Sequence, residues 1–319
     1  MFVSAKAKDV PGQERRSAAS SYRARSYKRR FPWIRATFLI PAILYIIVFY
    51  GYPLAYSIVV SFQRYDLQAE IRGSAAFIGL TNYISVYGDP IFQQSLWHTV
   101  LFTVGSIVPQ FLIGLALAVF FYRRFPLSTF LRSLILLPWL IPLVVGGTVW
   151  RWLFDQTNGI LDQILSGLGL VPAHFGWLTT PTWSLVAIII ANIWIGIPFN
   201  TVILYSGLQG ISRDFYEAAS LDGAGKWQIF RYVTLPLLRP VIGVVLILGL
   251  IYTLKVFDII YIMTGGGPAN DTQIFATWSY NLSFSQQLFG QGAALGNTIM
   301  LIAIIVALVY LWRSAKEAA

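Results

Sequence analysis

Residues 211–240 read ISRDFYEAASLDGAGKWQIFRYVTLPLLRP, a polar segment between two strongly apolar ones. Each flanking run is about as long as the roughly 20 apolar residues that a helix needs to cross the hydrocarbon core of a bilayer. Further runs of this kind lie along the chain, and the six predicted spans are residues 37–61, 96–121, 134–154, 185–207, 240–263 and 294–312. The sequence therefore predicts an all-α membrane protein with a transmembrane helix at each of these runs.

The overall composition also indicates a membrane protein. Of the 319 residues, 56% are hydrophobic and 11% are charged. Soluble proteins carry about 25% charged residues, because water must wet their surface. Prolines within the first and third spans predict kinks or breaks there, and these are Pro41, Pro53, Pro138 and Pro142.

The 23 Lys and Arg residues are distributed unevenly between the two sides of the membrane. They gather in residues 1–35, in the loops 122–133 and 208–239, and at the C-terminal end, and the exceptions are Arg64, Arg72, Arg151 and Lys255. Cytoplasmic loops carry such an excess of basic residues. Both termini are therefore predicted to be cytoplasmic, and the net charge of +10 indicates this topology rather than nucleic-acid binding.

On this topology the chain divides into three parts. Residues 1–35 are expected to form a disordered basic cytoplasmic tail. The apolar run that follows is too long for the core of a signal peptide, so it is expected to be an uncleaved anchor. Residues 36–312 form the transmembrane domain, with the cytoplasmic loop 211–239 inside it, and residues 313–319 form a C-terminal cytoplasmic tail.

Loop 211–239 contains the signals for two short helices. Ser212 is a capping residue for a helix that begins near Arg213. This helix should end at Asp222-Gly223, because glycine favours the left-handed conformation that closes a helix. A second helix is predicted from Trp227 to Val233, which should end before Leu235-Pro236. With Trp227 and Phe230 on one side, this helix–turn–helix suits insertion into a groove on another protein.

The same loop resembles the EAA loop of binding-protein-dependent ABC importer permeases. The pattern consists of Glu217-Ala218-Ala219, then Gly223, then Val233-x-Leu235-Pro236, with valine where the family usually has isoleucine. In that family the loop is a coupling helix that docks into the ATPase subunit. The resemblance implies ATPase contact or loop shape as the role of nine residues: Glu217, Ala218, Ala219, Asp222, Gly223, Ala224, Phe230, Leu235 and Pro236.

Segments outside the loop resemble the carbohydrate-uptake branch of these permeases. They include Tyr52-Pro53-Leu54 in the first span, Phe77-Ile78-Gly79-Leu80 after it, and the run from Phe257 to Pro268. The last segment is similar to the maltose-type F or glycerol-phosphate-type A permease. The resemblance implies a type I importer permease in the bacterial inner membrane. It would work with a second homologous permease, two ATPase subunits and an extracytoplasmic sugar-binding protein.

The resemblance also implies a substrate path near the middle of the membrane. Motif spacing assigns it to six positions: Asn192, Gly196, Phe199, Gly249, Thr253 and Val256. An amide or hydroxyl can bond a sugar hydroxyl, and an aromatic ring can stack on a sugar. Only Asn192 and Thr253 are polar, so sugar contact and polar contact between helices are both open. The sugar itself also stays open among trehalose, maltose, a longer oligosaccharide and a glycerol phosphate.

Two charged residues, Lys255 and Asp258, fall within or close to the fifth span. Three positions apart on a helix, they would share a face and could pair. Charges inside a membrane are costly, and they mark functional sites by default. A functional pair and a structural ion pair that orients the helix are both consistent with this spacing.

Several other activities find no support in the sequence. Gly225-Lys226 lacks the glycine five positions earlier and the following Ser or Thr of a phosphate-binding loop, so ATP and magnesium are expected on the partner ATPase. The chain has no cysteine and only two histidines, which predicts no metal site. With no catalytic constellation, the chain is expected to be a non-enzymatic subunit. The alternative is a secondary transporter or channel subunit that works without an ATPase.

Overall fold

The computed structural model describes residues 33–123 and 125–317. Most of the predicted N-terminal tail lies outside these residues. The chain forms two units, and the boundary between them falls between Gly51 and Tyr52. In the first unit, α1 (Trp33–Ile46) and the π-helical η1 (Ile47–Gly51) expose their large apolar side chains from Leu39 onward. Such a surface is suited to contact with lipid.

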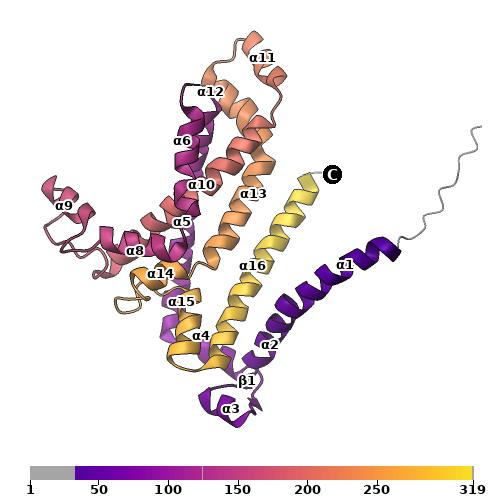
Figure 1. Cartoon of the computed structure of the whole chain (residues 1–319), viewed down its shortest axis with the longest axis vertical. Coiled ribbons are helices and arrows are strands. Elements are labelled where there is room, and N and C mark those ends of the chain that lie inside the picture. The colour runs from indigo at the N-terminus through magenta and orange to yellow at the C-terminus, as the bar shows by residue number, and fades with distance from the viewer. Residues whose placement is uncertain (1–32, 124, 318–319) are drawn as a thin grey trace, which may run out of the picture. The chain divides into compact units, whose positions relative to one another are not determined.

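Among the described residues, five helices are long and apolar enough to cross a membrane. One covers Leu39–Ser61, and the others are α5 (Pro90–Tyr122), α10 (Pro181–Gln209), the helix that ends with α13 (Leu235–Leu254), and α16 (Phe289–Glu317). They confirm the predicted spans at 37–61, 96–121, 185–207 and 294–312, with ends that differ by several residues. In the second unit, α5, α10 and α13 pack against one another (Figure 1).

The third predicted span, residues 134–154, is broken rather than continuous. α6 (Ser128–Ile135) and α7 (Leu137–Leu140) precede the break, α8 (Leu143–Leu153) follows it, and the axis bends there by 95°. Pro142 accounts for the break, because it has no N–H to donate and holds Ile141 extended, at φ −78° and ψ 131°. Counting this bent pair as one span gives six among the described residues, as the sequence predicts.

Small residues bring α5 and α10 close together. A Cβ added to Gly114 of α5 would lie 2.5 Å from the Cβ of Asn200 in α10, and one added to Gly105 would lie 3.1 Å from Ile189. Membrane helices use glycine in this way to let their backbones approach. The α5–α10 pair thus supplies a rigid centre for the second unit.

The fifth predicted span, residues 240–263, is also interrupted. α13 ends at Leu254, and a separate helix, α14 (Asp258–Met263), packs against α8. Gly147 of α8 permits this packing, because a Cβ there would lie 3.3 Å from Ile262. α15 (Phe275–Tyr280) and η3 (Asn281–Ser285) then lead into α16.

A small subdomain joins α2 (Tyr52–Ser61) to α5. It contains β1 (Gln63–Arg64), α3 (Leu67–Arg72), β2 (Ala76–Phe77) and α4 (Thr81–Gly88). The strands pair antiparallel, with Gln63 opposite Phe77. The buried Asn82 amide donates to the carbonyls of Ser61 and Gln63, at 2.9 and 2.8 Å, and so fixes the end of α2.

The segment between α8 and α10 is organised by one buried carboxylate. Asp162 lies in α9 (Ile160–Gly167) and accepts hydrogen bonds from the N–H groups of His174 and Phe175 and from the indole of Trp177. His174 therefore lies in a structural loop, where its imidazole Nδ1 meets the carbonyl of Gln156 at 2.9 Å.

Candidate functional site

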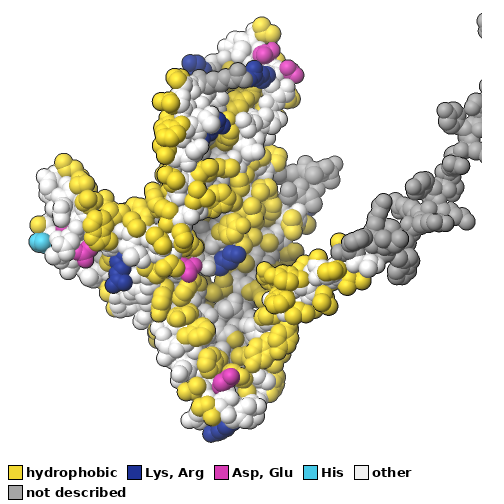
Figure 2. Space-filling model, viewed as in Figure 1, with side chains coloured by type: hydrophobic (Ala, Val, Ile, Leu, Met, Phe, Trp, Pro, Cys, Tyr) yellow, Lys and Arg dark blue, Asp and Glu magenta, His cyan; other side chains and the backbone are white. Residues whose placement is uncertain are grey.

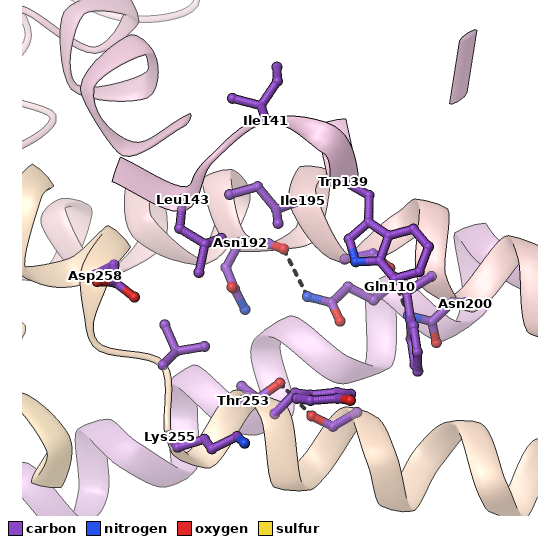
Figure 3. A pocket seen from close by; sticks show the side chains of 15 residues that line it. Gln110, Trp139, Ile141, Leu143, Asn192, Ile195, Asn200, Thr253, Lys255 and Asp258 are labelled. Carbon is purple, nitrogen blue, oxygen red and sulfur yellow. Dashed lines mark hydrogen bonds between the residues drawn. The ribbon is translucent and has the colours of Figure 1, made fainter. Parts of the chain in front are cut away.

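A cavity of about 540 Å³ lies among α5, α7, α10 and the end of α13, and we call it the central cavity (Figure 3). Eight of its lining residues are those that the sequence singled out within the membrane: Asn192, Gly196, Phe199, Gly249, Thr253, Val256, Lys255 and Asp258. The structure thus brings together side chains from two predicted spans around one space. The lining also includes four large or polar residues that sequence reasoning missed: Gln110, Trp139, Asn200 and Tyr252.

Gln110 of α5 is the main polar link across this cavity. Its side-chain amide donates to the backbone carbonyl of Asn192 in α10, at 2.8 Å (Figure 3). Gly196 makes room for it, because a Cβ there would lie 2.3 Å from the Gln110 side chain. The glycine is therefore required for packing between helices, which its spacing in the sequence does not reveal.

The polar side chains of the central cavity differ in their hydrogen bonds. Thr253 donates to the carbonyl of Gly249 in its own helix, at 2.7 Å, and Asn200 donates to Gly196 in the same way, at 2.9 Å. Within residues 33–123 and 125–317, the side-chain amide of Asn192 has no hydrogen-bond partner. Neither Thr253 nor Asn192 links two helices through its side chain. The amide of Asn192 is thus available to a molecule in the cavity.

Aromatic rings from three elements form a row along the central cavity. The Phe199 ring meets Trp139 of α7 at a centroid distance of 6.1 Å and Tyr252 of α13 at 5.7 Å, both in edge-to-face arrangements. The Lys255 ammonium lies 5.2 Å from the centre of the Tyr252 ring. Trp139 reaches the cavity because the chain turns after α7, at the break before Pro142. The prolines of this span are the one signal that could have pointed to Trp139.

The predicted pairing of Lys255 with Asp258 on one helix face is wrong. The helix ends between them, so Lys255 caps the C-terminus of α13 and Asp258 begins α14. They form no ion pair, and their side chains enter the cavity from separate stretches of backbone (Figure 3). Each charge matches the dipole of its own helix end, where a cation at the C-terminus and an anion at the N-terminus are stabilised.

The first half of loop 211–239 folds as the sequence predicts. α11 spans Arg213–Leu221, and Ser212 Oγ caps it by accepting from the N–H of Asp214, at 3.3 Å. The helix closes with two reverse bonds, from Ala224 N–H to the Ala219 carbonyl and from Gly223 N–H to the Ser220 carbonyl. Gly223 has φ +80°, the left-handed conformation that this closure requires.

The second half of the loop differs from the prediction of a helix that ends before Leu235-Pro236. α12 (Lys226–Ile229) continues through the π-helical η2 (Phe230–Thr234) directly into α13. The Leu235 N–H bonds the carbonyl of Phe230, five positions back. This wider turn moves the carbonyls away from the Pro236 ring, which would clash with them in an α-helix. A π-helical turn also precedes Tyr52-Pro53.

The nine predicted coupling residues are either exposed or partly buried. Glu217, Ala218, Asp222 and Gly223 are exposed, whereas Ala219, Ala224, Phe230, Leu235 and Pro236 are partly buried. Around them Phe215, Leu221 and Trp227 expose 53%, 89% and 70% of their surface. Tyr216 helps to anchor the loop to the bundle, because it packs on Tyr122 at the end of α5. This burial raises the pKa of the Tyr216 hydroxyl. The loop therefore presents an apolar surface on a fixed base.

Residues 110–314 match the family described as binding-protein-dependent transport system inner membrane component. This match includes the central cavity and the whole of loop 211–239. It covers well over half of the chain.

Two curated relatives align with most of the chain. The chain is 36% identical over 273 residues to the sulfoquinovosyl glycerol transport system permease protein SmoG of Agrobacterium fabrum, covering 86% of this chain and 87% of SmoG. It is 34% identical over 273 residues to the trehalose/maltose transport system permease protein MalF of Thermococcus litoralis, covering 86% of this chain and 90% of MalF.

The fold is also similar to that of solved transporter structures. A chain of a bacterial ABC transporter involved in the import of the acidic polysaccharide alginate superposes with a TM-score of 0.77, over 89% of this chain and 96% of that one. The two sequences are 22% identical, so this likeness concerns the fold alone.

Proposed function

The chain belongs to the family of binding-protein-dependent transport system inner membrane components, and from this membership we propose that it provides half of a sugar path. It is a multi-pass membrane subunit of an ABC importer, as its relatives and its fold indicate. Three further statements are proposals: that the substrate is a sugar, that it passes through the central cavity, and that a partner ATPase drives its transport. The single observation that carries the proposed substrate path is the convergence of the eight intramembrane residues on the central cavity.

The chemistry of the central cavity supports a sugar as the substrate. Sugars present hydroxyls along their edge and C–H groups on their faces, so they need hydrogen-bonding groups beside aromatic rings. The free amide of Asn192 and the row Trp139, Phe199 and Tyr252 supply both. A largely apolar cavity with a few polar groups is typical of small-molecule sites. The names of SmoG and MalF, which specify sugar compounds, add weight to this assignment.

Loop 211–239 is proposed to dock into an ATPase subunit. Exposed Phe215, Leu221 and Trp227 would enter a groove on that subunit, with Glu217 and the Gly223 turn setting the angle of approach. Because η2 joins α12 to α13 without a break, a movement of the docked loop would pass directly into α13, which lines the central cavity. ATP and magnesium would be bound by the partner, and this chain would perform no hydrolysis.

The proposed assembly contains this chain, a second homologous permease, two ATPase subunits and an extracytoplasmic sugar-binding protein. The second permease would supply the other half of the path. The basic residues at the end that carries loop 211–239 support a cytoplasmic position for this loop and for both termini. The bacterial inner membrane is the proposed location.

Reconstitution tests this function directly. The chain, its partner permease and the ATPase subunits are placed in vesicles with the binding protein and radiolabelled sugar. Uptake is expected only with ATP present, and Glu217→Arg should allow ATP hydrolysis while abolishing uptake. Uptake at full rate without the ATPase subunits would overturn the proposal and favour a secondary transporter or channel subunit.

A further inference from the structure

A second cavity, of about 710 Å³, lies where α5, α6, α10 and α11 meet, and we call it the arginine pocket. Arg123, Arg132 and Arg213 line it, and no Asp or Glu does. Basic side chains gather near the end of the molecule that carries α6, α11 and α12 (Figures 1 and 2). The proposed function does not use this cavity.

The arginines of this pocket form no ion pair with any described residue. Arg132 is fixed in place, since its side chain donates to the Ser128 carbonyl at 3.3 Å and to Thr129 Oγ1 at 3.2 Å, and its guanidinium lies 4.6 Å from the centre of the Tyr205 ring. Arg123 and Arg213 are exposed and make no such bonds. Their donors are free for an anion.

The pocket lies at the level where a phospholipid headgroup would lie. It is lined by the last residues of α5 and the last turns of α10, which are both spanning helices. The Lys and Arg distribution predicts this end to be cytoplasmic. Arginine clusters at this level bind phosphate groups, because the guanidinium donates two parallel hydrogen bonds to a phosphate.

An apolar groove continues from the arginine pocket toward the membrane. This groove has a volume of about 250 Å³ and shares Phe121, Thr129, Arg132 and Tyr205 with the pocket. Its remaining lining is mainly aliphatic, from α6 and α10. A charged compartment joined to an apolar one matches a phospholipid, with its headgroup in the first and the start of an acyl chain in the second. A free phosphate would use only the first.

We propose that the arginine pocket binds an anionic phospholipid of the inner leaflet. Arg123, Arg132 and Arg213 hold its phosphate, and the groove between α6 and α10 holds an acyl chain. Arg213 is the first residue of α11, so the bound lipid ties the base of loop 211–239 to α5 and α6. If the loop couples transport to ATP hydrolysis as proposed above, this lipid would set how firmly the coupling helix is held.

Native mass spectrometry of the full chain in detergent tests this binding without any partner subunit. Phosphatidylglycerol and phosphatidylcholine are added in turn. Phosphatidylglycerol is expected to be retained more strongly than phosphatidylcholine. Each arginine is expected to contribute about fivefold to the retention of phosphatidylglycerol. The double variant Arg123→Gln/Arg213→Gln should therefore weaken this retention by more than about tenfold. Both side chains are exposed, so their loss does not disturb packing. Arg313→Gln removes an exposed arginine of α16 and should leave retention unchanged.

A second experiment separates a lipid from a free phosphate. Ser133 lines only the apolar groove, and Ser133→Trp should lower phosphatidylglycerol retention severalfold without changing charge. Millimolar inorganic phosphate should not displace the lipid. Equal retention of both lipids, full retention by the double arginine variant, or displacement by phosphate would each overturn the proposal.

Discussion

Loop 211–239 is stabilised by hydrogen bonds between residues that are close in the sequence, whereas the central cavity depends on a hydrogen bond between residues far apart in the sequence. In the loop, the decisive bonds join near neighbours, such as Ala224 to Ala219 and Gly225 N–H to Gln228 Oε1. In the cavity, the decisive bond joins Gln110 to Asn192, which are 82 positions apart. A substitution in the loop changes a local turn, whereas a substitution in the cavity also displaces its contact residue on another helix. Larger losses of transport are therefore expected from collisions in the cavity than from changes in the loop.

The largest effect is expected for Gly196→Leu in the central cavity. A side chain at this position would collide with Gln110 and fill the space among the rings. Overpacking of this kind typically destabilises a protein by about 1–3 kcal/mol. Because the leucine would also block the proposed sugar path, ATP-driven uptake should fall by about a hundredfold, which corresponds to roughly 2.7 kcal/mol in the barrier to transport. Uptake in reconstituted vesicles measures the change.

Gly249→Ala is the matched control, because a Cβ at Gly249 meets nothing within 4 Å. It adds a single methyl group to the same cavity without a collision, so its uptake should fall far less than that of Gly196→Leu. A pair of variants then tests the long-range contact: Gln110→Ala should restore thermal stability to Gly196→Ala, since it removes the colliding side chain. Equal stability of Gly196→Ala and the wild type would contradict the close approach of α5 and α10.

A smaller effect is expected for Gly223→Val in loop 211–239. The residue must adopt φ +80°, and a left-handed conformation costs an L-residue roughly 1–2 kcal/mol, so uptake should fall about tenfold. The protein should still insert, because the turn is exposed. Measurement of uptake beside the rate of ATP hydrolysis checks the result.

The neighbouring glycine provides the control for this turn. Gly225 has φ −71°, which any residue adopts, so Gly225→Ala should transport normally. Normal uptake by Gly223→Val would mean that the closure of α11 does not matter for docking.

An intermediate effect on sugar affinity is expected for Asn192→Leu. The amide of Asn192 has no partner among the described residues, and loss of one hydrogen bond to a sugar costs about 0.5–1.5 kcal/mol, so the apparent KM should rise about fivefold. Thr253→Val should change it less, since the Thr253 hydroxyl is already bonded to Gly249. An unchanged KM for both variants across a panel of sugars would show that neither residue contacts the substrate and would assign recognition to the partner permease.

The smallest effect is expected for Ser212→Ala at the start of α11. Loss of an N-cap costs typically about 1 kcal/mol, and here Tyr216 still anchors the helix on Tyr122. Coupled uptake should therefore fall only about twofold to threefold at a constant level of protein in the membrane. A loss as large as that of Gly223→Val would indicate that folding of α11, rather than the shape of its turn, limits coupling.

Local patterns in the sequence predicted the spans and α11 well, because both depend on neighbouring residues. Apolar length identifies a spanning helix, and the pair Ser212 and Gly223 identifies the ends of α11. Proline was less informative, since Pro142 breaks its span whereas Pro236 is accommodated by the π-helical turn. A proline signals a disturbed helix, but the surrounding packing decides which disturbance occurs.

The sequence by itself determined the apolar spans, the basic bias of the loops and the turn at Gly223, since each follows from residue type and short spacing. Only the tertiary structure decided that Gln110 lies over Gly196 and that Trp139 packs against the ring of Phe199. It also decided that Lys255 and Asp258 belong to different helices. The physical reason is that spacing along a chain fixes a helix face, whereas the approach of two helices depends on side chains from both of them.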